Sequence, residues 1–285
     1  MLTEQKQLEL ALIANEIRKE TIKSIASIGI GHLGGSLSIA DLLAVLYFDQ
    51  MKIDPNNPKK PDRDMLVCSK GHAGPAVYSA LAIKGYFPKD LLYTLNKSNT
   101  DLPSHCDMRK TPGIDMTTGS LGQGISTACG IALANKMDGK NTLYTYCIMG
   151  DGESQEGQIW EAAMFASHRA LGNLIAFVDN NNLQIDGTVD QVCSLGDISE
   201  KYRSFGWDAV RVDGHDVAAI HNAIENAKKI TDKPSVIVLN TVKGKGIKSI
   251  ENQASNHNMS INPAQLEAYL NELDEKACAL KGGCV

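Results

Sequence analysis

Apolar and polar positions along this chain predict strands that alternate with helices. Short apolar runs bounded by turn residues read as buried strands, and they lie at residues 65–68, 143–149, 174–178, 208–212 and 235–240. Helical periodicity marks most of the intervening segments, at residues 4–27, 38–48, 73–84, 125–136, 156–170 and 217–229. This alternation favours an α/β fold built on a doubly wound parallel sheet with helices on both faces.

The chain shows no internal repeat, low-complexity linker or break in composition, so we expect a single domain over residues 1–285, with a short polar C-terminal tail from about residue 262. Its 285 residues and 43% hydrophobic content are enough for a sizeable core. Residues 96–120 are polar, glycine-rich and irregular. A loop of that length inside a compact domain usually has a functional reason.

Charge and cysteine content narrow the class of protein. The net charge of -5 gives no electrostatic reason to expect nucleic acid or an anionic membrane as partner. The N-terminus lacks the basic segment and apolar run of a signal peptide, and no apolar stretch approaches transmembrane length. The seven cysteines are scattered without a Cys-x-x-Cys pair, so no disulfide framework or zinc site is indicated. We therefore expect a cytoplasmic protein with reduced thiols.

Two of the predicted strands end in polar turns, GDG at 150–152 and DNN at 179–181. Open parallel sheets bind their ligands at the carboxyl ends of strands. The Asp151 carboxylate and the Asn181 amide oxygen are hard donors of the kind that Mg²⁺ or Ca²⁺ prefers when it also holds a diphosphate. Each turn alone is ordinary loop chemistry. Together, separated by one helix, they predict a site for a metal and a diphosphate.

Glycine placement supports this site and weakens a competing one. Gly152 would let the backbone approach a diphosphate, and the residues from Glu153 onward resemble a helix start, whose free N–H groups favour an anion. Residues 29–34 form a formal G-x-G-x-x-G, but they follow an amphipathic helix instead of the strand that a dinucleotide site requires. The better glycine loop is 118–124, because it leads directly into a helix.

Histidines in short loops are the other candidates for chemistry. Imidazole titrates near neutrality and can donate hydrogen bonds to sugar hydroxyls, to a developing oxyanion and to a diphosphate. Four of the seven lie beside glycine or small polar residues, namely His32, His72, His105 and His257. We interpret the others, in or near predicted helices, as structural, namely His168, His215 and His221.

Several long motifs in order resemble the N-terminal half of a transketolase, from near residue 5 to about residue 260. They are GHLGGSLS, SKGHAGPAVY, TPGIDMTTGSLGQG, GDGESQEGQIWEA, VDNNNLQIDG and TVKGKG. In that family the N-terminal domain binds the diphosphate and metal, and a second domain binds the aminopyrimidine ring. The resemblance implies the diphosphate-binding type of the thiamine diphosphate-binding fold, with thiamine diphosphate and Mg²⁺ or Ca²⁺ as cofactors.

The resemblance also implies which residues hold these cofactors. Asp151, Asn181 and the backbone carbonyl of Leu183 would coordinate the metal. Gly152 and His72 would hold the diphosphate. Contacts with the cofactor rings are implied for Gly119 and Leu121.

Substrate-facing residues are implied in the same way. His32, His105 and His257 would line the substrate channel, contact donor hydroxyls and help proton transfer. Glu156 lies just after the first turn, where it could hydrogen-bond to an activating glutamate of a partner. Asn258 follows His257 where the family often has glycine, and His105 sits in SHCD instead of a Pro-Gly-His string.

The implied reaction is transfer of a two-carbon ketol unit from a ketose or ketose phosphate to an aldose or aldose phosphate through a thiamine diphosphate enamine, as in the pentose phosphate pathway of carbohydrate metabolism. Because the family's second domain does not follow in this chain, we expect the N-terminal subunit of a split transketolase. Its partner would be a C-terminal subunit carrying the pyrimidine-binding domain, in a heterotetramer of two and two. Phosphate recognition belongs to that other half, so the sugars stay open.

Two alternatives also stay open. One is the diphosphate-binding subunit of another thiamine diphosphate enzyme of the 2-oxo acid dehydrogenase type. It is disfavoured because 2-oxo acids lack the hydroxyls that the four histidines would serve. The other is a non-catalytic assembly protein that kept the fold, against which the retention of Asp151, Asn181 and the histidines argues.

Overall fold

Five apolar runs form one parallel sheet in the computed structural model, which describes residues 2–283. The strand order is β2-β3-β4-β8-β7. In chain order the strands are β2 (Met65–Cys68), β3 (Thr145–Gly150), β4 (Leu174–Asn180), β7 (Asp208–Asp213) and β8 (Ser235–Asn240). The predicted α/β fold with a parallel sheet is confirmed.

Alternate residues of the central strands feed two separate hydrophobic clusters, because successive side chains of a strand point to opposite faces. Tyr146 and Ile148 of β3 belong to one cluster, and Cys147 and Met149 belong to the other. Burial on both faces explains why β3, β4 and β8 read as continuous apolar runs.

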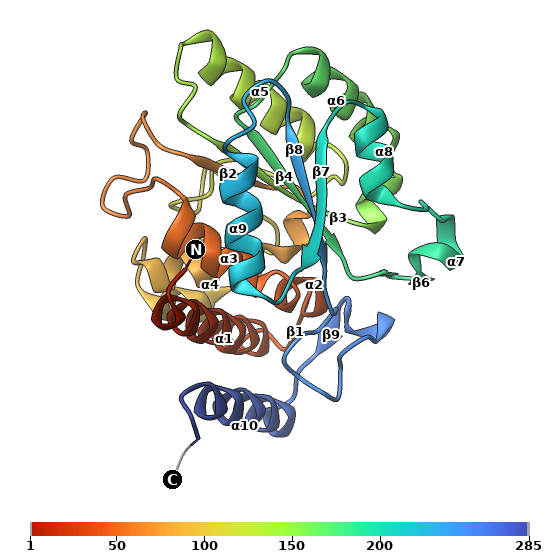
Figure 1. Cartoon of the computed structure of the whole chain (residues 1–285). Helices are drawn as coiled ribbons and strands as arrows, with labels where there is room; N and C mark the ends of the chain where they lie inside the picture. The colour runs from red at the N-terminus through yellow and green to blue at the C-terminus, as the bar shows by residue number, and fades with distance from the viewer. Residues whose placement is uncertain (1, 284–285) are drawn as a thin grey trace.

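Helices cover both faces of the sheet, as expected (Figure 1). The first face is covered by α1 (Glu4–Ala26), α3 (Ala40–Val45), α4 (Gly74–Lys84) and α9 (Val217–Ala227). The second is covered by α5 (Gly124–Met137), α6 (Gly157–His168) and α8 (Ile198–Ser204). Among residues 2–283, every helix is too short or too polar to span a lipid bilayer.

Short elements complete the fold. The two small sheets pair β1 (Ile30–Gly31) with β9 (Met259–Ser260) and β5 (Leu183–Gln184) with β6 (Gly187–Thr188). Short helices and turns are α2 (Gly34–Leu37), α7 (Val189–Cys193), η1 (Leu46–Gln50), η2 (Gly71–Ala73), η3 (Lys89–Thr94), η4 (Gly152–Gln155) and η5 (Ala254–Asn256). The G-x-G-x-x-G segment thus follows α1 and pairs with β9, outside any βαβ unit. The stretch 96–120 has no helix or strand, as predicted.

The polar tail expected from about residue 262 is in the structure largely a helix, α10 (Pro263–Leu280). Asn262 and Gln265 form a reciprocal capping box at its start. Tyr269 and Leu273 are buried, and Asn15 of α1 donates a hydrogen bond to the Leu273 carbonyl at 2.8 Å. Because few apolar residues, spaced four apart, carry this packing, the polar average of the segment hides the helix.

Candidate functional site

The two polar turns lie side by side at the carboxyl edge of the sheet. The β3–β4 register pairs Gly150 with Asp179, and the Asp151 N–H donates to the Asp179 carbonyl at 3.2 Å. Both Asp151 and Asn181 are buried. The Asp151 carboxylate accepts hydrogen bonds from the backbone N–H groups of Gly152 and Asn182. The fold therefore holds both predicted oxygen donors at one place.

A cavity of about 240 Å³ opens between these turns and the loops around them. Most residues predicted to hold the cofactor or metal line it, together with two of the predicted catalytic residues. They are His72, Leu121, Asp151, Gly152, Asn181, Leu183, Glu156 and His257. The remaining predicted residues, His32, His105 and Gly119, do not line this cavity, but a series of contacts links them to its lining residue His257. A Cβ built on Gly119 would lie 3.2 Å from the His105 ring, and both His105 and His257 pack against His32.

The four loop histidines form one cluster. The ring centroid of His32 lies 5.3 Å from that of His72, 5.5 Å from that of His105 and 5.4 Å from that of His257. Burial lowers the pKa of all four, and with the help of the Lys243 ammonium it lowers that of His257 to about 4. Neutral imidazoles each offer one donor and one acceptor to a polar ligand.

The other histidines do not line the cavity. His215 Nδ1 lies 2.7 Å from the Asp41 carboxylate, and its Nε2 accepts the Val242 N–H at 2.8 Å. His221 Nδ1 lies 2.7 Å from the Asp49 carboxylate. His215 and His221 thus join segments far apart in the sequence, which is the structural role expected of them.

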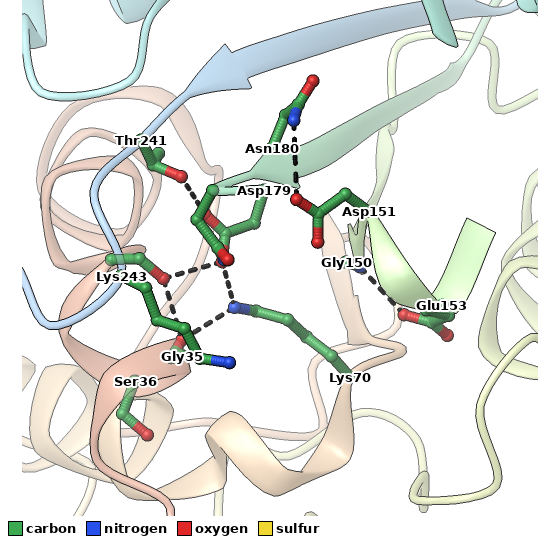
Figure 2. Close-up of polar contacts among 12 residues, drawn as sticks. Gly35, Ser36, Lys70, Gly150, Asp151, Glu153, Asp179, Asn180, Thr241 and Lys243 are labelled. Carbon is green, nitrogen blue, oxygen red and sulfur yellow. Dashed lines mark hydrogen bonds and ion pairs between the residues drawn. The ribbon is translucent and has the colours of Figure 1, made fainter. Parts of the chain in front are cut away.

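A buried ion pair at the cavity wall was not predicted from the sequence. The Lys70 ammonium donates to the Asp179 carboxylate at 2.5 Å and to the Gly35 carbonyl at 2.7 Å (Figure 2). Asp179 also accepts from Ser38 and Thr241. Burial alone would raise the pKa of Asp179, but Lys70 and these hydrogen bonds lower it. Lys70 lies in the same SKGH string as His72, which was expected to hold the diphosphate. Asp179 lies in the same DNN string as Asn181, which was expected to coordinate the metal.

Glu153 is a second unpredicted residue, and its contacts correct the expected helix start. Residues Gly152–Gln155 form a single 3₁₀ turn, and α6 begins only at Gly157. The Glu153 carboxylate turns inward and accepts from the N–H groups of Gly122 at 2.9 Å and Gly150 at 3.0 Å, and from the Ser69 hydroxyl. Burial raises its pKa. It therefore ties the glycine loop to the first polar turn.

Lys243 is the third unpredicted residue. Its ammonium donates to the Leu183 carbonyl at 3.1 Å and lies 3.2 Å from His257 Nδ1. Burial and the nearby Lys70 ammonium lower the pKa of Lys243 to about 8, against the opposing charges of Asp151 and Asp179. The TVKGKG string contained this lysine, but only the tertiary structure places it beside Leu183.

The comparisons with known proteins agree with this geometry. Residues 10–274 match the family described as "Transketolase, thiamine diphosphate binding domain". The chain is 55% identical, over 95% of its length and 98% of the relative, to the 6-deoxy-6-sulfo-D-fructose transketolase subunit SqwG of Clostridium sp. (strain MSTE9). It is 37% identical, over 94% of each chain, to one of the subunits of the apulose-4-phosphate transketolase of Phocaeicola vulgatus.

Among solved structures, the transketolase of Campylobacter jejuni superposes with a TM-score of 0.86 at 31% identity. The match covers 94% of this chain and 42% of that one, so the chain spans less than half of that transketolase and nearly all of the two subunit relatives. The chain belongs to the transketolase family, as a subunit of a ketol transferase that carries its thiamine diphosphate-binding domain.

Proposed function

We propose that this chain binds the diphosphate of thiamine diphosphate through a divalent metal, and that it transfers ketol units together with a separate C-terminal subunit carrying the pyrimidine-binding domain. The observation that carries the proposal is the convergence of the four loop histidines, with four pairs of ring centroids 5.1 to 5.5 Å apart, beside the oxygen donors of the two polar turns.

The donor set supports a hard divalent cation such as Mg²⁺ or Ca²⁺. Asp151 is a buried carboxylate whose pKa is raised to about 6 by burial and by Asp179, and its hydrogen-bond partners are neutral N–H groups. A buried carboxylate that is not paired with a cation is stabilised when it coordinates a metal ion. The Asn181 amide and the Leu183 carbonyl add oxygen ligands of the preferred type. Within residues 2–283 no cluster of three or more acidic, histidine or cysteine side chains offers a different kind of metal site.

The chain's own residues would hold the cofactor and handle the substrate. Gly152 and His72 are proposed to hold the diphosphate, and Gly119 and Leu121 to contact the cofactor rings. When bound, thiamine diphosphate supplies the carbanion chemistry at the ketose carbonyl. His32, His105 and His257 are proposed to bind donor hydroxyls and to move protons to and from them, since neutral imidazoles can both donate and accept.

A partner is proposed because the expected role of Glu156 is a contact with another subunit, the one that carries the pyrimidine-binding domain. Glu156 lines the cavity just before α6 begins, where it would meet an activating glutamate of the partner. Two relatives are themselves named as subunits, which supports a divided enzyme. We propose a heterotetramer of two and two in the cytoplasm.

The names of the relatives point away from the pentose phosphate pathway that the family resemblance first suggested. The 55% identical relative is named for 6-deoxy-6-sulfo-D-fructose and the 37% identical relative for apulose 4-phosphate. We therefore propose 6-deoxy-6-sulfo-D-fructose as the ketose donor, with a phosphorylated ketose as the second candidate.

The test is to isolate the native complex, identify the co-purifying subunit, and assay the reconstituted pair with thiamine diphosphate and Mg²⁺. Sulfofructose and fructose 6-phosphate are offered as donors with an aldose phosphate as acceptor, and a 2-oxo acid is offered separately. We expect ketol transfer that needs both subunits and is lost in Asp151→Asn. Full activity of this chain alone, or 2-oxo acid decarboxylation without ketol transfer, would contradict the proposal.

A further inference from the structure

Lys243 presents its ammonium at the place where the proposed metal site needs a free oxygen. It lies just after β8, and its side chain is almost fully buried, at 2% exposure. Figure 2 shows Lys243 and Lys70 reaching from different segments toward the space below Asp179. The two lysines are held differently, because Lys70 is paired with the Asp179 carboxylate whereas Lys243 bonds only neutral acceptors.

The contact with Leu183 is the informative one. The Leu183 carbonyl oxygen, the third proposed metal ligand, accepts the Lys243 ammonium at 3.1 Å. A metal bound to the same oxygen would lie about 2.0 to 2.6 Å from it. An ammonium and a divalent ion on one carbonyl would then be two neighbouring cations in a buried site, where repulsion is weakly screened.

The Lys243 ammonium can also move away from the Leu183 carbonyl. A buried ammonium is held firmly only when a carboxylate compensates its charge, and the acceptors of Lys243 are a carbonyl and an imidazole. Its four-carbon stem allows the ammonium to move by several ångströms without backbone change. The cavity that would receive an anionic diphosphate is lined by this same side chain.

We propose that the Lys243 ammonium is the resident cation of the metal site: it occupies the Leu183 carbonyl in the metal-free protein and withdraws from it when the divalent metal enters. The inference rests on the proposed function, since it takes the metal ligands from there. Metal binding is then an exchange of one cation for another. The exchange keeps the Leu183 oxygen bonded and the Asp151 and Asp179 charges partly compensated in both states.

The test measures metal binding directly, with Mn²⁺ as the probe and its electron paramagnetic resonance signal as the readout. The full chain is titrated alone, and again with thiamine diphosphate and the partner subunit. Lys243→Met keeps the apolar stem and removes the charge. We expect it to bind Mn²⁺ about tenfold more tightly than the wild type when thiamine diphosphate is absent, because the competing cation is gone. Lys243→Arg, which restores a cation, should bind as weakly as the wild type or more weakly.

Lys248→Met is the matched control, since Lys248 lies on the same loop but is exposed. It removes the same charge and should leave Mn²⁺ affinity within twofold of the wild type. Lys243→Gln covers the case in which Lys243→Met fails to fold, because the amide can still donate to the Leu183 carbonyl without carrying a charge. Thermal melting of each variant checks that it is folded.

The outcomes separate the exchange from the proposed function. If the wild-type complex with thiamine diphosphate binds no Mn²⁺, the metal assignment itself fails. If the wild type binds Mn²⁺ but the uncharged variants show unchanged or weaker affinity without the diphosphate, the site stands and the cation exchange is overturned. A purely structural role for Lys243 would give that second result, because loosening the Leu183 loop would weaken metal binding.

Discussion

At the scale of single residues, Glu153 was not predicted as a site residue, yet its carboxylate links two segments of the site. Its carboxylate accepts hydrogen bonds from the glycine loop at Gly122, from the first polar turn at Gly150 and from Ser69. Two of these partners are backbone groups of the segments proposed to contact the cofactor rings and the diphosphate. Glu153 therefore acts as a positioning residue for both.

We expect Glu153→Ala to weaken thiamine diphosphate binding by about tenfold, since two buried N–H groups lose their acceptor and the loop and the turn are no longer tied. Isothermal titration of the reconstituted complex in the presence of Mg²⁺ measures this affinity. Glu161→Ala on the exposed side of α6 is the matched control and should bind normally. An unchanged affinity in folded Glu153→Ala would remove the positioning role.

The buried carboxylate of Asp41 is a second important single residue, and it contributes to the free energy of unfolding. It bonds Arg18 through two nitrogens and lies 2.7 Å from His215 Nδ1. Removing one partner of a buried ion pair leaves an uncompensated charge. We expect Asp41→Asn to lower the free energy of unfolding by about 3 to 5 kcal/mol in urea titrations at pH 7. The exposed pair Lys19–Asp274 provides the control, because Asp274→Asn should cost less than about 1 kcal/mol.

The same carboxylate predicts a pH dependence. Burial alone would raise the pKa of Asp41, but Arg18 and His215 lower it below its ordinary value of 3.8. A carboxyl with a depressed folded-state pKa contributes stability that is complete above the unfolded-state value and is lost as pH falls through the folded-state value. The stability gap between the wild type and Asp41→Asn should therefore be constant near neutrality and shrink below pH 3.8. A gap that narrows between pH 7 and pH 5 would contradict this assignment.

At the scale of elements, the strands were predictable because each is an apolar run closed by turn residues. The expected strand 65–68 coincides with β2, and the run 174–178 extends to Asn180 in β4. The helix predicted over 156–170 is α6, but the helix start expected at Glu153 is a separate 3₁₀ turn, because the Glu153 carboxylate is drawn inward by the glycine loop. Tertiary contacts override local propensity in such places.

The candidate site, too, was only partly predictable from the sequence. Asp151, Asn181 and the histidines were predictable, because each lies in a short polar string at a strand end or glycine turn. Lys70 and Lys243 were not, because a lysine in a loop is usually solvated. Their partners Asp179 and Leu183 are more than 50 residues away along the chain. Only the parallel register of β2, β3, β4 and β8 brings those segments to one edge.

The helix α10 gives an element-scale prediction. Leu273 is fully buried where α10 packs on α1. Its side chain also lies beside Gly246, in the loop that carries Lys243. Leu273→Ala should lower the free energy of unfolding by about 2 to 5 kcal/mol. Leu280→Ala at the exposed end of the same helix should change it by less than about 1 kcal/mol. Equal effects of the two substitutions in urea titrations would show that α10 is not docked in solution.

At the scale of the whole molecule, the helices on the two faces of the sheet differ in how far their outer surfaces are covered. The first face carries α1, which is itself covered by α10. On the second face, α5 and α6 pack against each other and expose apolar side chains outward, with Met137 at 78%, Met164 at 57% and Phe165 at 39% exposure. Exposed apolar patches mark sites of interaction with other proteins, and these three side chains are candidates for such a patch.

These two helices also begin at the cavity. Leu121 and Glu156 line it, and they lie just before α5 and α6 begin. A partner that completes the cofactor site at this rim can therefore continue along both helices. A Cβ built on Gly130 of α5 meets no atom within 4 Å, so a partner helix could approach the α5 backbone closely there. The outer surface of α5 and α6 is the face that we expect the proposed C-terminal subunit to cover.

This expectation gives the last prediction. A carboxylate introduced by Met164→Asp would be buried without a counter-charge in the complex but would stay solvated in the free chain. We expect the Kd for the partner subunit to rise by at least about thirtyfold, equivalent to the ~2 kcal/mol of an interface hot spot. Biolayer interferometry with the immobilised partner measures it. Leu280→Asp, an equally polar change at an exposed apolar residue of α10, should leave the Kd unchanged. If both variants bind alike and both are folded, the partner covers another face, and the rim residues Leu121 and Glu156 must be reached from a different direction.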